Sequence, residues 1–89
     1  MGINGNQFLT EMVIHVTETL DESGVRAAEC DLCNLNGVVE ARHNPGRNHV
    51  LLVTYDTVET RMVNLLAPLK ARGLRAQLVG IMHTRAVGR

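Results

Sequence analysis

The residues of this chain best suited to chemistry are its two cysteines, Cys30 and Cys33, which form a Cys-x-x-Cys. Residues three apart on a helix are neighbours on its surface. Two thiolates at that spacing can hold a soft ion such as Cu(I). A tight zinc site takes four ligands, so Zn would also need a histidine or a second chain. The first hypothesis for this pair is therefore a metal site for Cu(I) or Zn.

Two other interpretations of the pair stay open at this point. A redox pair needs a thiolate, which forms most readily at a helix N-terminus or beside a cation. Here the pair falls near the end of a predicted helix, where the dipole is negative, and Glu29 and Asp31 flank Cys30. These features disfavour redox catalysis. The remaining interpretation is structural, because free cysteines often serve as small apolar residues of a packed interior.

The rest of the sequence contains no set of residues typical of an enzyme. The four histidines do not form a spaced cluster, and each is interpreted as a surface residue: His15, His43, His49 and His83. We find no nucleophile–base–acid set, no paired carboxylates in a plausible cleft and no phosphate-binding loop. We therefore expect a protein that is not an enzyme.

The cysteines must be positioned by a helix predicted over about 22–34. Its apolar residues recur at spacings of three, four and three, as on one face of an amphipathic helix: Val25, Ala28, Leu32 and Leu35. Either Asp21 or Ser23 can serve as its N-cap. At about 100° per residue, Cys30 points away from the apolar face and Cys33 lies on its flank. The phase thus predicts cysteines turned towards solvent or a partner.

Alternation and turn signals predict four strands, at about 12–17, 38–43, 49–55 and 74–81. A second helix is expected to begin near Asp56 and end at Gly73, and Pro68 inside it should kink the helix or shift its end. This order predicts a ferredoxin-like βαββαβ sandwich, an α+β fold with a four-stranded antiparallel sheet and both helices on one face. The predicted core adds six residues to those of the first helix: Leu51, Val53, Tyr55, Met62, Leu65 and Leu69.

Strand parity leaves four apolar residues on the sheet face that the helices do not cover, namely Val13, Val50, Leu52 and Val79. We call these four the open-face patch. A contiguous apolar patch on a small sheet is typical of a contact surface. The patch therefore predicts an interface with a protein partner or with a second copy of the chain. The alternative is that the first nine residues or the tail fold back over the patch, with Phe8 covering it.

Composition indicates one globular domain over residues 10–82, with a flexible N-terminus over 1–9 and a flexible tail over 83–89. We expect neither a signal peptide nor a membrane-inserted segment, so the expected location is the cytoplasm. The net charge is zero, but eight of the nine basic residues lie after Glu40. They are scattered and have no aromatic platform beside them, so no nucleic-acid partner is expected.

Three segments resemble heavy-metal-associated domains, the small fold of copper chaperones and of the N-terminal modules of metal-pumping ATPases. They are Leu35-Asn36-Gly37-Val38, Val53-Thr54-Tyr55-Asp56 and the segment 71–80, and the resemblance extends over about Met12 to Ile81. It implies the same ferredoxin-like fold, binding of a soft metal and a metal transporter as a partner.

The chain departs from that family at the metal site. The family's Met-Thr-Cys-x-x-Cys in the first loop falls on residues 19–24, and its two ligand positions hold Asp21 and Gly24. The usual site is therefore absent, and the function hypothesis is a metal-binding domain that uses the displaced pair Cys30 and Cys33. The alternative is a metal-free protein-interaction domain. A further alternative is an ACT-like ligand-binding domain, because the first loop resembles the Asp-x-x-Gly-Val of that family.

Overall fold

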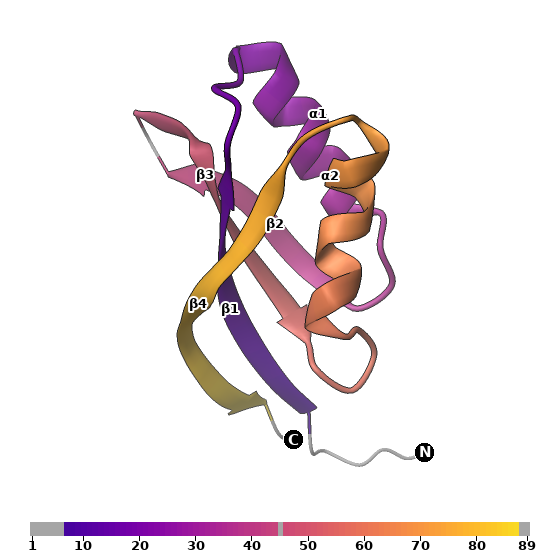
Figure 1. The fold of residues 1–89 in the computed structure, drawn as a ribbon. Helices are drawn as coiled ribbons and strands as arrows, with labels where there is room; N and C mark the ends of the chain where they lie inside the picture. The colour runs from indigo at the N-terminus through magenta and orange to yellow at the C-terminus, as the bar shows by residue number, and fades with distance from the viewer. Residues whose placement is uncertain (1–6, 45, 88–89) are drawn as a thin grey trace.

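The computed structural model describes residues 7–44 and 46–87, with side chains described over 9–44 and 46–81 (Figure 1). Four strands, two α-helices and one short 3₁₀ helix follow one another along the described chain. In order they are β1 Gln7–Val16, α1 Glu22–Cys33, β2 Val38–Asn44, β3 Arg47–Asp56, η1 Met62–Leu66, α2 Ala67–Ala71 and β4 Ala76–Val87. The predicted βαββαβ order is confirmed.

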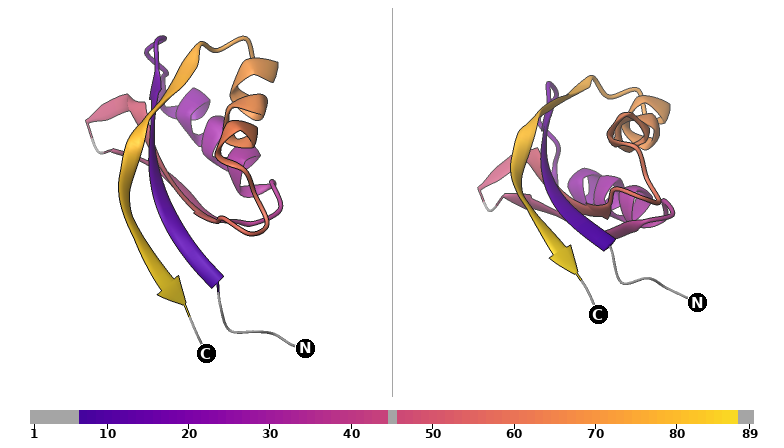
Figure 2. Two further views of the ribbon diagram at one scale, coloured as in Figure 1. Left: turned by 60° about the horizontal axis from the view of Figure 1, so that its bottom comes forward. Right: turned by 90° about the horizontal axis from the view of Figure 1, so that it is seen from below.

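The four strands form one antiparallel sheet in the order β2-β3-β1-β4. Both α-helices lie on the same side of this sheet, and the other side is left open (Figure 2). The predicted ferredoxin-like sandwich is therefore confirmed. Because β1 and β3 are central, side chains from these two strands meet in the middle of each sheet face.

The core lies between the sheet and the helices. Alternate residues of β1 are buried in this core, namely Met12, Ile14 and Val16. Eight of the ten predicted core residues are also buried: Val25, Ala28, Leu32, Leu51, Val53, Tyr55, Leu65 and Leu69. Leu35 is half-buried and packs against this cluster. Periodicity located these residues because each element keeps its regular period where it faces the core.

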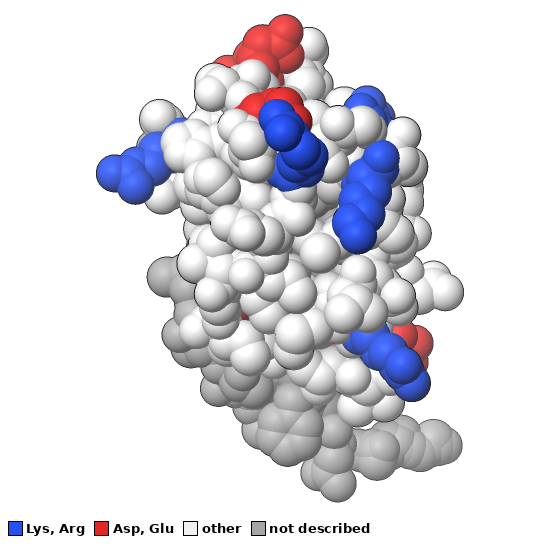
Figure 3. Space-filling view, in the orientation of Figure 1, with Lys and Arg blue, Asp and Glu red and all other residues white. Residues whose placement is uncertain are grey.

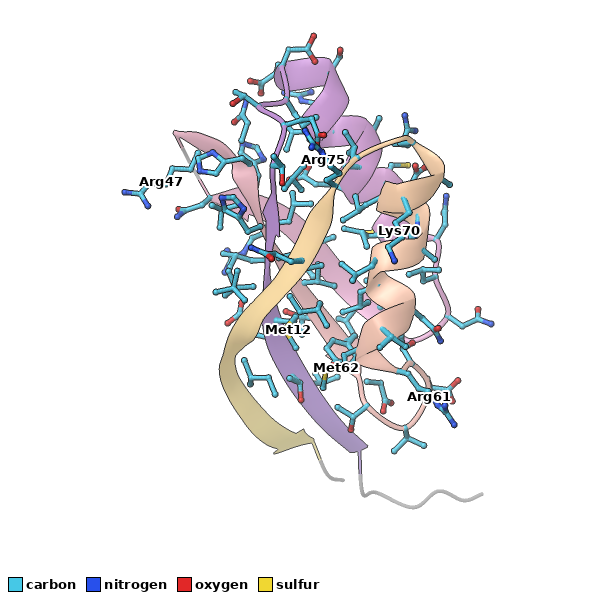
Figure 4. The ribbon with its side chains drawn as sticks, in the orientation of Figure 1. Met12, Arg47, Arg61, Met62, Lys70 and Arg75 are labelled. Carbon is cyan, nitrogen blue, oxygen red and sulfur yellow. The ribbon has the colours of Figure 1, made fainter. Side chains whose placement is uncertain are left out.

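Met62 was predicted to be buried, and this prediction is wrong: its exposed fraction is 42%. Met62 begins η1, at the lower end of that element in Figure 4. It lies beside an open hollow of about 400 Å³ that Tyr55, Thr60 and Val63 also line. Its side chain therefore borders this hollow, whereas Leu65 in the same element reaches the core.

The second helix also begins later than predicted. After β3 the chain turns, with the Asp56 carboxylate accepting the Val58 N–H at 2.8 Å and the Asp56 carbonyl accepting the Thr60 N–H at 2.9 Å. Pro68 then lies in the first turn of α2. A proline is tolerated there because that N–H has no partner within the helix. Pro68 therefore lies just after the first residue of α2, and the predicted kink inside a longer helix is not found.

The outer strands extend beyond their predicted ends. Gln7 pairs with Val87, so 7–9 and 83–87 belong to β1 and β4 and not to the predicted terminal segments. Residues 1–6 and 88–89 lie outside the described residues, as does the side chain of Phe8, and their predicted flexibility and covering role stay predictions. The pairing of β4 with β1 shifts register twice, which leaves Val79 without a direct partner in β1.

Leu65→Ala is expected to destabilise the fold by about 2–5 kcal/mol, because it removes a fully buried side chain and leaves a cavity. Urea unfolding measures this change in the free energy of unfolding. Val63→Ala is a matched control in the same η1 segment. Val63 is 61% exposed, so its truncation should change stability by no more than about 0.5 kcal/mol. Equal effects of the two substitutions would contradict the observed packing of η1.

Candidate functional site

The cysteines lie on the last turn of α1, on the side facing away from the core. The buried residues of α1 are Val25, Ala28 and Leu32. Cys30 and Cys33 are both exposed and both free thiols. The predicted orientation is confirmed, and a role as ordinary packed interior residues does not fit it. Whether the pair holds a metal stays a prediction.

The first loop, where the resembling family has its ligands, is occupied by a helix cap. The Asp21 carboxylate accepts the Gly24 N–H at 2.7 Å and the Ser23 hydroxyl at 3.3 Å. Asp21, and not Ser23, is therefore the N-cap of α1. Gly24 has no side chain to offer. These two residues start the helix and present no thiolate to a soft ion.

The acidic neighbours of the cysteines are paired with cationic or imidazole groups. Asp31 accepts a hydrogen bond from the Arg72 guanidinium, and this bond holds the pKa of Asp31 below its ordinary value. The pKa of Arg72 is raised, mainly by Asp31 and to a smaller extent by the charge of Cys30. Glu29 contacts His43, with 2.8 Å between Oε2 and Nδ1. Sequence adjacency alone therefore overstated the negative charge that acts on the thiols.

Two histidines that the sequence analysis interpreted as separate surface residues lie together. The ring centroids of His15 in β1 and His49 in β3 are 5.2 Å apart, with the rings at 82° to each other. Simple alternation puts them on opposite sheet faces. The pairing of β2 with β3 shifts register between His43 and Asn44, next to the turn that joins the two strands. Strict alternation therefore does not hold at the start of β3, where His49 lies. The side chain of His83 lies outside the described residues.

The open-face patch is only partly exposed. Val13 pairs directly with Leu52, and both are half-buried, as is Val50. Val79 is 62% exposed. Arg42 of β2 reaches across β3 to Glu11 of β1, at 3.5 Å. The face therefore combines apolar side chains with a bridging ion pair, and its role as an interface stays a prediction.

Basic side chains do not gather into one surface on the face seen in Figure 3. Arg47 lies at the β2–β3 turn, Arg61 precedes η1 and Lys70 lies on α2 (Figure 4). Within the described ranges, no group of three or more His, Cys, Asp or Glu side chains is arranged to hold a metal ion. Nor does any helix in these ranges have the length and apolar character needed to cross a membrane.

The chain matches no family model and no curated protein. Several solved structures share its fold, among them the following three. A copper binding domain from HMA7, a P-type ATPase, has a TM-score of 0.76 at 18% identity, with 83% of this chain and 99% of that chain covered. Oxidized MerP from Ralstonia metallidurans CH34 has a TM-score of 0.72 at 12% identity, with 81% and 99% covered. A putative copper-ion-binding protein from Bacillus anthracis str. Ames has a TM-score of 0.69 at 20% identity, with 78% and 96% covered.

The chain has the fold of a heavy-metal-associated domain. The resemblance in sequence is thus confirmed at the level of fold. Identities of 12–20% say nothing about which residues act. A metal site at Cys30 and Cys33 stays a prediction, and the Arg72–Asp31 contact lies beside the pair on α1.

Arg72→Gln is expected to raise the pKa of Asp31 towards its ordinary value of 3.8, because the hydrogen bond from Arg72 is the main cause of the lowered pKa. A carbon-detected NMR titration of the carboxyl groups measures this change. Glu18 is the internal control, since Arg75 is what lowers its pKa. An Asp31 titration unchanged by the substitution would contradict the contact.

The sign of the pH effect on stability follows from the same shift. A carboxyl whose pKa is lower in the folded state stabilises the fold at a pH above its unfolded-state pKa, and this contribution is lost as the pH falls through the folded-state value. The contribution of Asp31 is therefore expected to disappear in acid below about pH 4. Arg72→Gln should remove that part of the acid dependence.

Proposed function

We propose that this domain binds a soft metal ion, Cu(I), through the thiolates of Cys30 and Cys33. The observation that carries the proposal is that both thiols are free and exposed on one turn of α1. The fold supports it, because solved structures described as copper-binding share this fold. The first loop supplies no competing ligand, since the Asp21 carboxylate caps α1.

The chemistry of the donors favours Cu(I) over zinc. Soft thiolates select Cu(I), which two ligands can hold, whereas structural zinc takes four. Within the described residues no third His, Cys, Asp or Glu joins the pair. A metal ion also deprotonates the thiols that bind it. Arg72 lies close enough to Cys30 for the charges of the two groups to interact.

An exposed pair suits transfer of the ion more than its storage. Neither thiol is enclosed, so a partner with thiolates of its own can approach the bound ion directly. The partner proposed on this basis is a metal transporter or another protein in the same transfer chain. This role requires no catalytic group, and the domain is proposed to act as a carrier and not as an enzyme.

One Cu(I) per chain is expected to bind the wild-type protein, in competition with a chromophoric Cu(I) chelator. Cys30→Ser and Cys33→Ser should each weaken binding by well over about tenfold, more than the loss of a partner outside the coordination shell. Serine is close to cysteine in size, and both positions are exposed, so the fold should persist.

Asp21→Asn is the matched control for this titration. Asparagine caps a helix about as well as aspartate, so α1 should be unaffected and Cu(I) affinity unchanged. Affinity that persists in the double serine variant would place the ion elsewhere. If wild-type protein purified without an affinity tag neither contains nor binds copper tightly, the proposal is wrong.

A second candidate function is a metal-free interaction domain that self-associates through the open-face patch. It is supported by Val79, which is 62% exposed on a strand at the sheet edge, and by the half-buried Val13–Leu52 pair. The ACT-like alternative has less support. A small carboxylate would need free amides at the start of α1, and the Gly24 N–H is already bonded to Asp21.

Leu52→Glu is expected to abolish self-association, because it would place a charge at the centre of the patch between two stacked sheets. Sedimentation at several protein concentrations measures the effect. Val63→Glu is the control, since that exposed residue lies on η1 and outside the patch. A wild-type protein that stays monomeric at high concentration would exclude this candidate.

A further inference from the structure

The contact between His15 and His49 brings two imidazoles together from different strands. Their centroids are 5.2 Å apart in an edge-to-face arrangement. His15 lies on β1 between Ile14 and Val16, which are both buried under the helices, so its ring points to the open face of the sheet. Both histidines are half-buried.

The ring nitrogens of these two histidines are not used within the fold. Over the ranges that the structure describes, neither His15 nor His49 forms a hydrogen bond or an ion pair with another residue. His43 differs in this respect, because its Nδ1 is engaged by Glu29. An edge-to-face pair is favourable by itself. It does not, however, use the lone pairs, which stay available to an outside ligand.

We propose that His15 and His49 form a site for a borderline divalent transition-metal ion such as Cu²⁺ or Zn²⁺. Neutral imidazole is the ligand that these ions prefer among uncharged side chains, and Cu²⁺ binds most strongly in the divalent series. Water completes the coordination shell. Gln77 of β4 lies directly opposite His15 and offers an amide oxygen beside the site.

This site differs from the cysteine pair in position and in chemistry. His15 faces the open side of the sheet, whereas α1 carries Cys30 and Cys33 on the outer surface of the opposite side (Figure 1). Thiolates select soft Cu(I), and imidazoles select borderline divalent ions. The two sites can therefore be occupied and tested independently.

The test is a Cu²⁺ titration of the full chain carrying Cys30→Ser and Cys33→Ser, which removes thiols that would bind or reduce the ion. One Cu²⁺ per chain should bind, with electron paramagnetic resonance couplings from two imidazole nitrogens. His15→Gln and His49→Gln should each weaken binding by at least about tenfold, because even partners outside the coordination shell are worth that much. Binding should also release protons and weaken in acid.

His43→Gln is the matched control, since it removes an imidazole that Glu29 already engages. It should leave Cu²⁺ affinity unchanged. Broadening of histidine ring signals by substoichiometric Cu²⁺ gives a second measurement that needs no histidine variant, and His15 and His49 should broaden before His43. Three outcomes would overturn the proposal: no binding, binding insensitive to both histidine substitutions, or an equal loss in His43→Gln.

Discussion

The backbone at Gly37 packs closely against Glu59 and Thr60, and the position of the cysteine pair depends on this contact. Gly37 has φ +90°, and a Cβ there would overlap the Thr60 hydroxyl and lie 2.6 Å from the Glu59 Cβ. The Gly37 carbonyl accepts the Asp56 N–H at 2.7 Å, and the Asn36 carbonyl accepts the Thr60 hydroxyl. Only glycine suits this backbone and this packing. The helix must therefore end before Gly37, which puts Cys30 and Cys33 on its last turn.

Two polar contacts join the last turn of α1 to neighbouring elements. The Asp31–Arg72 contact joins α1 to the residue that caps α2, and the Glu29–His43 contact joins α1 to β2. Exposed ion pairs contribute little to the free energy of folding. Their effect here is local, because each gives an acidic neighbour of Cys30 a partner on another element. Cys30 and Cys33 are thus exposed on a turn whose acidic residues, Glu29 and Asp31, both contact other elements.

Periodicity predicted most of the fold, because burial on one face dictates the spacing of apolar residues in α1, β1 and β3. It failed where the backbone departs from its regular period. In β2 a register shift between Val38 and Glu40 breaks the alternation and leaves Val39 61% exposed. The His15–His49 pair was missed for a similar reason, since alternation cannot anticipate a shift in register. The Arg72–Asp31 contact spans 41 positions in sequence and left no local signal.

The displaced position of the cysteines has a physical consequence for the proposed chemistry. In the resembling family the ligands are in the loop that opens the first helix, where the positive end of the dipole favours thiolates. Cys30 and Cys33 lie at the other end and lack that support. The C-cap residue of α2, Arg72, is a cation whose charge interacts with that of Cys30. In the proposed site the metal ion itself would have to displace the thiol protons. The same fold thus offers a position for a cysteine pair at either end of α1, with the helix dipole of opposite sign at the two positions.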